Sequence, residues 1–226
     1  NGTEDLKFTR SGNAVFGNAG TDTVTGINNL NVTGTLGLNT TNITGVGAFD
    51  IDGLTTIADG ITAVIDSGSG TGNIDLAAVT AGDAVGQNLS LDAGTNNDAD
   101  ITIAGTVTNI DTLLITAAGQ LTLGGAVTVD TLNITSGVDD VTWQAGGTIT
   151  NAATLANTGF TKIGANGITT TFTGGLTATT GTFSGDVTAS TAGINTSWTS
   201  PVGPMSFVFS RNITKATTDV TEGFNF

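Results

Sequence analysis

Apolar residues recur along the chain at intervals of about twenty residues, and in the carboxyl-terminal half they form three columns that advance together. The first column, spaced by 20 residues throughout, is Ile103, Leu123, Trp143, Ile163 and Phe183. The second is Val107, Val127, Ile149, Ile168 and Val187, and the third is Leu113, Leu132, Leu155 and Leu176. Three columns per cycle predict an all-β, parallel, three-sided β-solenoid (β-helix) of about 20 residues per coil. We expect the first column to be a stack of core residues.

Small and β-branched residues keep the same register as these columns. Two residues before each second-column residue stand Gly105, Gly125, Gly147, Asn166 and Gly185. Glycine and asparagine enter the left-handed backbone region most readily, so we predict a tight corner there. Directly after the second column stand Thr108, Thr128, Thr150, Thr169 and Thr188, and Thr102, Thr122, Thr142, Lys162 and Thr182 precede the first column. Successive strand residues face opposite ways, so these polar residues should form outward ladders.

The two ends of the chain depart from the repeat, which predicts three parts. Residues 1–20 are expected to be an amino-terminal cap or connector, residues 21–197 the solenoid, and residues 198–226 an aromatic-rich strand module. That module would either cap its own last coil or connect subunits, since an apolar patch of its size usually marks an interface. Head-to-tail stacking would bring it against the amino-terminal segment of the next copy. The predicted subunit contact is Trp198, Phe207, Phe209, Arg211, Phe224, Phe226, Lys7 and Arg10.

Composition and charge narrow the function. The net charge is −14, from five basic and 19 acidic residues, and no Lys or Arg occurs between residues 11 and 161. Such a surface makes nucleic acid and anionic membranes poor partners. No run of 20 apolar residues is present to cross a membrane. The chain starts at Asn1 rather than Met, so we expect that a leader or upstream region has been removed.

The chain contains few residues that are suited to catalysis. Without Cys or His the chain can form neither a disulfide nor a Ser–His or Cys–His dyad. The carboxylate pairs Asp50/Asp52, Asp98/Asp100 and Asp139/Asp140 could serve glycoside hydrolysis in principle, but they fit solvated turns better. Aspartates could also bind calcium, yet the glycine-aspartate nonapeptide of calcium-binding β-rolls does not occur. We therefore expect no enzyme activity, no cofactor and no dedicated metal site.

Two surface patterns leave alternatives open. Thr-X-Thr at residues 106–108 and 148–150 would suit ice binding, but Ala126, Gly167 and Asp186 occupy the equivalent positions and interrupt the array. Asn-X-Ser/Thr sequons, which a glycosylating host can modify, begin at Asn1, Asn31, Asn39, Asn42, Asn88, Asn133, Asn195 and Asn212.

Segments such as residues 126–135 (AVTVDTLNIT) and 174–185 (GGLTATTGTFSG) resemble β-helical passengers of bacterial haemagglutinin-type and autotransporter adhesins. They are also similar to repeats of some phage tail fibres, and the resemblance covers residues 21–195. It implies a secreted, elongated, adhesive or structural protein. We expect a non-enzymatic extracellular subunit of a self-assembling surface filament or adhesin fibre. Its main partner would be further copies of itself, with host or cell-surface glycans as further partners. The alternative is a monomeric glycan- or ice-binding β-solenoid.

Overall fold

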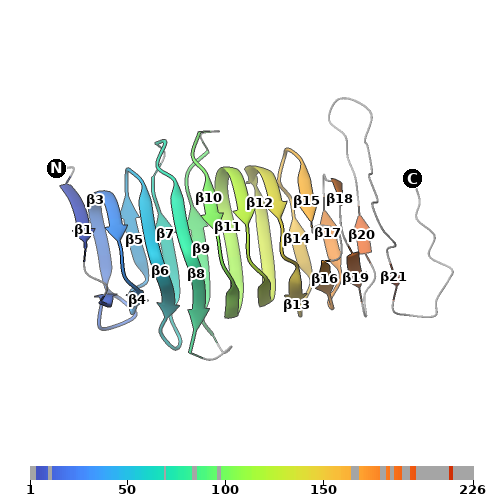
Figure 1. The fold of residues 1–226 in the computed structure, drawn as a ribbon, viewed down its shortest axis with the longest axis horizontal. Helices are drawn as coiled ribbons and strands as arrows, with labels where there is room; N and C mark the ends of the chain where they lie inside the picture. The colour runs from blue at the N-terminus through green and yellow to red at the C-terminus, as the bar shows by residue number, and fades with distance from the viewer. Residues whose placement is uncertain are drawn as a thin grey trace.

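In the computed structural model the chain winds into one elongated stack of coils, with the amino terminus at one end (Figure 1). The structure describes residues 4–9, 12–68, 70–82, 86–95, 98–163 and 168–178, and the backbone of short strands at 182–183, 186–189, 194–196 and 214–215. Every regular element in these residues is a β-strand, and every strand pair is parallel. The predicted all-β parallel solenoid is confirmed.

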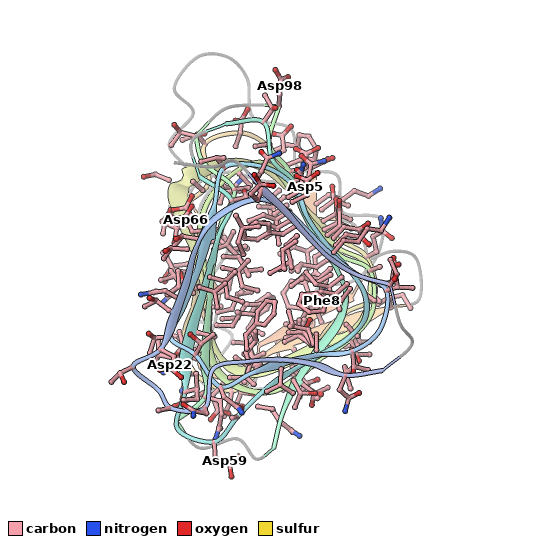
Figure 2. All side chains as sticks on the ribbon, turned by 90° about the vertical axis from the view of Figure 1, so that its left-hand side faces the viewer. Asp5, Phe8, Asp22, Asp59, Asp66 and Asp98 are labelled. Carbon is pink, nitrogen blue, oxygen red and sulfur yellow. The ribbon has the colours of Figure 1, made fainter. Side chains whose placement is uncertain are left out.

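Viewed along its axis, the solenoid has three sides around a core of apolar side chains (Figure 2). Face A consists of β1 (Glu4–Phe8), the end of β3 (Thr23–Val32), the starts of β6 (Phe49–Ile57) and β8 (Ile74–Ala81), β10 (Ile101–Ile103), the ends of β11 (Val107–Leu123) and β12 (Val127–Trp143), β15 (Thr161–Ile163) and β18 (Thr182–Phe183). Face B consists of β2 (Ala14–Phe16), β4 (Leu36–Leu38), the ends of β6 and β8, the starts of β11 and β12, β13 (Gly147–Ile149), β16 (Thr169–Phe172), β19 (Asp186–Ala189) and β21 (Thr214–Lys215). Face C consists of the start of β3, β5 (Asn42–Gly45), β7 (Thr62–Asp66), β9 (Asn88–Asp92), the middles of β11 and β12, β14 (Ala153–Leu155), β17 (Leu176–Ala178) and β20 (Ile194–Thr196).

The expected stack of core residues lies on face A. Strand pairing joins Ile103 to Leu123, Leu123 to Trp143 and Trp143 to Ile163, and all four side chains are fully buried. Backbone pairing continues the column to Phe183. In the other direction it continues through Leu76, Ile51 and Val32 to Phe8, at the amino-terminal end.

The second column was predicted in the wrong register at Ile149 and Ile168, and the third at Leu155, whereas Val187 and Leu176 lie in the predicted columns. Val127 pairs with Gly147, and Ile149 lies one inward position further along, opposite Val129. Gly147 in turn pairs with Thr170 rather than with Ile168, which is only half-buried. Gly147 and the buried Thr170 occupy the inward positions of this column, and the apolar residues predicted for it lie two residues away in the chain.

The third column shows the same displacement by one inward position. Leu113 pairs with Leu132 as expected, but Leu155 lies opposite Ile134. The inward position against Leu176 belongs to Ala153. All of these residues are buried, so the third column was predicted correctly as core and only Leu155 was placed in the wrong register.

The corner glycines between faces A and B are required mainly because two backbones approach closely. Gly105 and Gly125 do not have positive φ, contrary to the prediction, whereas Gly147 does at 134°. A Cβ on Gly125 would lie 2.1 Å from the carbonyl carbon of Gly105, and one on Gly105 would lie 2.5 Å from the oxygen of Ala77. Coils about 4.8 Å apart leave no room for a side chain pointing along the axis.

The coil length is regular only in part of the chain. From Ile103 to Ile163 each coil takes 20 residues, as predicted, but 27 residues separate the paired Leu76 and Ile103. The excess lies between β8 and β9 and between β9 and β10. Strands β1 and β2 already stack on β3 and β4, so the solenoid begins before residue 21. Whether this first coil is a cap or a connector stays a prediction.

Candidate functional site

The first coil presents an open strand edge at the amino-terminal end of the solenoid. This amino-terminal edge consists of β1, β2 and residues 23–24 of β3. Among the residues that the structure describes, β1 pairs only with β3, and β2 pairs only with β4. One side of each strand therefore carries backbone groups without a strand partner, which is the usual template for adding another chain.

The direction of each backbone group follows from the hydrogen bonds on the paired side. The N–H of Ala14 donates to the carbonyl of Thr35, and the carbonyl of Phe16 accepts from Asn39, both at 2.9 Å. In a parallel ladder, alternate residues turn both backbone groups toward the same neighbour. The N–H and C=O of Val15 therefore point away from β4, along the solenoid axis. The Phe8 carbonyl accepts from Thr33 at 3.0 Å, which places the backbone groups of Lys7 on the open side of β1 in the same way.

The core is less well covered at this end than in the middle of the stack. The Phe8 and Phe16 rings contact each other at a centroid distance of 5.6 Å. Phe8, like Leu6 and Val24, is only partly buried, while the corresponding residues of inner coils are fully buried. Figure 2 views this end directly and shows Phe8 pointing into the interior. A further coil stacked here would bury these side chains and extend the core.

Polar side chains line the outer surface of the first coil. Lys7 is exposed and pairs with Asn31 on face A. Asp5 accepts hydrogen bonds from the side-chain amides of Asn29 (2.9 Å) and Asn28 (2.8 Å), and these two bonds lower the pKa of Asp5. The amino-terminal edge thus combines an apolar interior with a charged and hydrogen-bonding rim.

Of the predicted subunit contact, only Lys7 lies in the described part of the chain. Arg10, Trp198, Phe207, Phe209, Arg211, Phe224 and Phe226 lie outside the described residues. Within the predicted module, β21 is described and pairs in parallel with β19, joining Thr188 to Thr214. This pairing extends face B beyond β19. Val15 was not among the predicted contact residues, although its place between the inward-facing Ala14 and Phe16 would have indicated an outward position.

An acidic column on face A brings three carboxylates of successive coils close together. Asp50 pairs with Asp75, and Asp100 begins the next coil nearby. Burial raises the pKa of Asp75; the hydrogen bond with Thr102 opposes this, and the charges of Asp50 and Asp100 add to it. The Asn31 amide donates to Asp50 at 3.0 Å. These bonds link side chains of adjacent coils.

The other carboxylate pairs also bond to neighbouring coils. Asp100 Oδ1 accepts from the N–H of Gln120 at 2.9 Å, and Asp140 Oδ1 accepts from the N–H of Phe160 at 2.8 Å. Burial raises the pKa of Asp140; the Phe160 N–H opposes the shift, and Asp139 adds to it. In the described part of the chain, no group of three or more acidic residues is placed to hold a metal ion.

An outward threonine ladder follows face B through successive coils. It contains Thr56, Thr80, Thr108, Thr128, Thr148, Thr171 and, by backbone pairing, Thr188 and Thr214. Thr150 and Thr169 were assigned to this ladder incorrectly, because the second column was out of register there. The ladder on face A, from Thr102 to Thr182, follows the predicted order.

Fold and edge together define a three-sided parallel β-solenoid whose first coil ends in an open strand edge. No described helix is long and apolar enough to span a membrane. Comparisons with protein families, curated proteins and solved structures found no match to the chain.

Proposed function

We propose that the protein is a secreted, non-enzymatic subunit of an extracellular filament or adhesin fibre, in which copies stack head to tail. The single observation that carries this proposal is the amino-terminal edge. Its strands have backbone groups directed along the axis and a partly exposed apolar end. Another copy with the same three-sided section would supply the missing strands.

Stacking in this way adds one subunit after another without closing into a ring. The contact is heterologous, since the amino-terminal end of one copy meets the carboxyl-terminal end of the next. Strand β21 supports the proposal because it places part of the 198–226 module in the ladder of face B. Lys7, on the rim, would meet the carboxyl-terminal end of a chain whose net charge is −14.

The proline variant Val15→Pro tests the proposal at one backbone group. Proline removes the N–H that points away from β4 and leaves the hydrogen bonds of Ala14 and Phe16 to β4 in place. Val15→Ala is the matched control, because it changes the same side chain, 57% exposed, and keeps the N–H. We expect filaments of the wild type and of Val15→Ala by electron microscopy, and folded monomers of Val15→Pro. Wild-type chains that stay monomeric, or filaments formed equally well by Val15→Pro, would overturn head-to-tail stacking at this edge.

Deleting residues 198–226 tests the role of the carboxyl-terminal module. If the module connects subunits, the shortened chain should remain folded by circular dichroism and stay monomeric. An aggregated or unfolded chain would identify the module as a cap instead. Filaments that still assemble would show that the module is not the connector.

The alternative proposal is a monomeric solenoid that binds glycans or ice. The continuous threonine ladder of face B favours this alternative, since it repeats a hydroxyl in every coil from Thr56 to Thr171. The neighbouring outward positions, Thr106, Ala126 and Gly146, do not form a second continuous rank. A monomeric wild-type chain that depresses the freezing point below the melting point would support ice binding.

A further inference from the structure

An open hollow lies at the corner where face C turns into face A. Its volume is about 300 Å³, and it is lined by Thr95, Ala118, Ser136, Gly137, Asp139 and Thr158. The lining comes from successive coils, so the hollow crosses several strands. Its volume is at the lower end of the range for small-molecule sites.

Hydrogen bonds hold the polar groups of this hollow in place. The Thr158 hydroxyl lies 3.2 Å from Asp139 Oδ1 and 3.3 Å from the carbonyl oxygen of Val138, and it can donate to either. The Thr158 N–H donates to the same Val138 carbonyl at 3.0 Å. Gly159 follows directly, and a Cβ there would lie 2.6 Å from Asp139 Oδ1. The lining therefore offers one hydroxyl and one carboxylate, those of Thr158 and Asp139, that are held in place before any ligand arrives.

An exposed aromatic residue, Phe160, follows the lining residue Thr158 closely in the chain. Phe160 is 45% exposed, whereas every other aromatic side chain that the structure describes is partly or fully buried. It follows Thr158 by two residues, so their Cα atoms are at most about 7.6 Å apart. Its N–H is bound to Asp140 Oδ1, which anchors the backbone beneath the ring. An apolar ring left in water costs free energy that a ligand covering it would recover.

We infer that this corner binds a neutral oligosaccharide. Hydroxyls and a carboxylate match the donors and acceptors of one sugar unit, and the Phe160 ring offers an apolar face to the C–H groups of the next. Nearby Asp139 and Asp140 disfavour an anionic ligand such as a nucleic acid. The site lies along the side of the solenoid, away from the amino-terminal edge. The inference therefore does not depend on filament assembly and holds equally for a monomer.

The test uses the full chain and three defined probes: cellohexaose, chitohexaose and mannohexaose. Saturation-transfer NMR detects weak binding, and a titration then gives the dissociation constant. We expect at least one probe to bind with a dissociation constant in the millimolar range or below. Phe160→Ala and Phe160→Leu should each weaken that binding about tenfold, which corresponds to about 1.4 kcal/mol for the lost aromatic face. Asp139→Asn should also weaken it, while keeping an oxygen for the Thr158 hydroxyl.

Leu54→Ala is the control variant, since Leu54 is exposed to 39% and lies between the two segments of β6 on faces A and B. It should bind like the wild type, and circular dichroism should show every variant folded. No signal from any of the three probes at about 10 mM would overturn the inference. Unchanged binding by both Phe160 variants would overturn it as well.

Discussion

Replacing Trp143 by alanine should destabilise the solenoid more than most single changes. The indole is fully buried in the column between Leu123 and Ile163. Its N–H donates to the carbonyl of Gly146 at 2.9 Å, and its ring meets Phe172 edge-on at a centroid distance of 5.8 Å. Removing a buried aromatic side chain costs about 3–5 kcal/mol of unfolding free energy. The Gly146 carbonyl would lose the indole N–H but would keep the N–H of Val127 as a donor, so the cost should stay within that range.

A smaller change separates the two contributions. Trp143→Phe keeps an aromatic ring in the core but removes the indole N–H, so we expect a loss of about 2 kcal/mol. Thr142→Ala, at the outward-facing neighbour, is the matched control and should cost less than about 1 kcal/mol. Unfolding is followed by far-ultraviolet circular dichroism in urea, because fluorescence would lose its main probe. A loss below about 1 kcal/mol for Trp143→Ala, in a reversible transition with an unchanged urea dependence, would refute the buried position.

Three further changes test individual features of the coils by the same denaturation assay. Thr55 has a buried hydroxyl with no hydrogen-bond partner in the structure, so Thr55→Val should raise the unfolding free energy by about 1 kcal/mol. The control Thr56→Val, on the exposed side, should leave the unfolding free energy nearly unchanged. A destabilised Thr55→Val would show that the hydroxyl has a partner. Gly125→Ala should lower the unfolding free energy by about 1–3 kcal/mol, because the new Cβ would meet backbone atoms. The control Gly12→Ala, which has open space around it, should leave the unfolding free energy nearly unchanged. Equal effects of the two changes would contradict the close packing of the corner. Folding raises the pKa of Asp75, so as the pH falls the folded chain binds a proton at Asp75 before the unfolded chain does. The wild type should therefore gain stability relative to Asp75→Asn as the pH falls from neutral toward about 4. A constant difference in stability across that range would contradict the raised pKa.

The sequence predicts the fold best where the inward positions are large and apolar. The column through Ile103, Leu123, Trp143 and Ile163 was recognised because each inward residue differs from its polar neighbours in hydropathy. Where Gly147 and Thr170 take inward positions, that contrast disappears and the register was misassigned by two residues. A period of two along a strand allows such an error while keeping the correct face inside.

Other features depend on contacts between coils and were harder to predict. The glycine of the A–B corner was identified, but its physical reason at Gly105 and Gly125 is backbone proximity rather than left-handed geometry. The hollow at the corner of faces C and A joins residues from Thr95 to Thr158, which no local motif connects. The open side of β2 follows from the hydrogen bonds of Ala14 and Phe16 to β4, which depend on residues of the next coil.

The direction of the backbone hydrogen bonds has a mechanical consequence. Strands lie across the long axis, so the bonds between coils lie along it. Tension applied to the two ends would load these bonds in series and open the coils one at a time, as a zipper opens, instead of shearing many bonds at once. Each coil contacts mainly its neighbours, so the loss of one leaves the rest of the stack intact. A fibre built this way would lengthen in steps under load and dissipate energy before it broke.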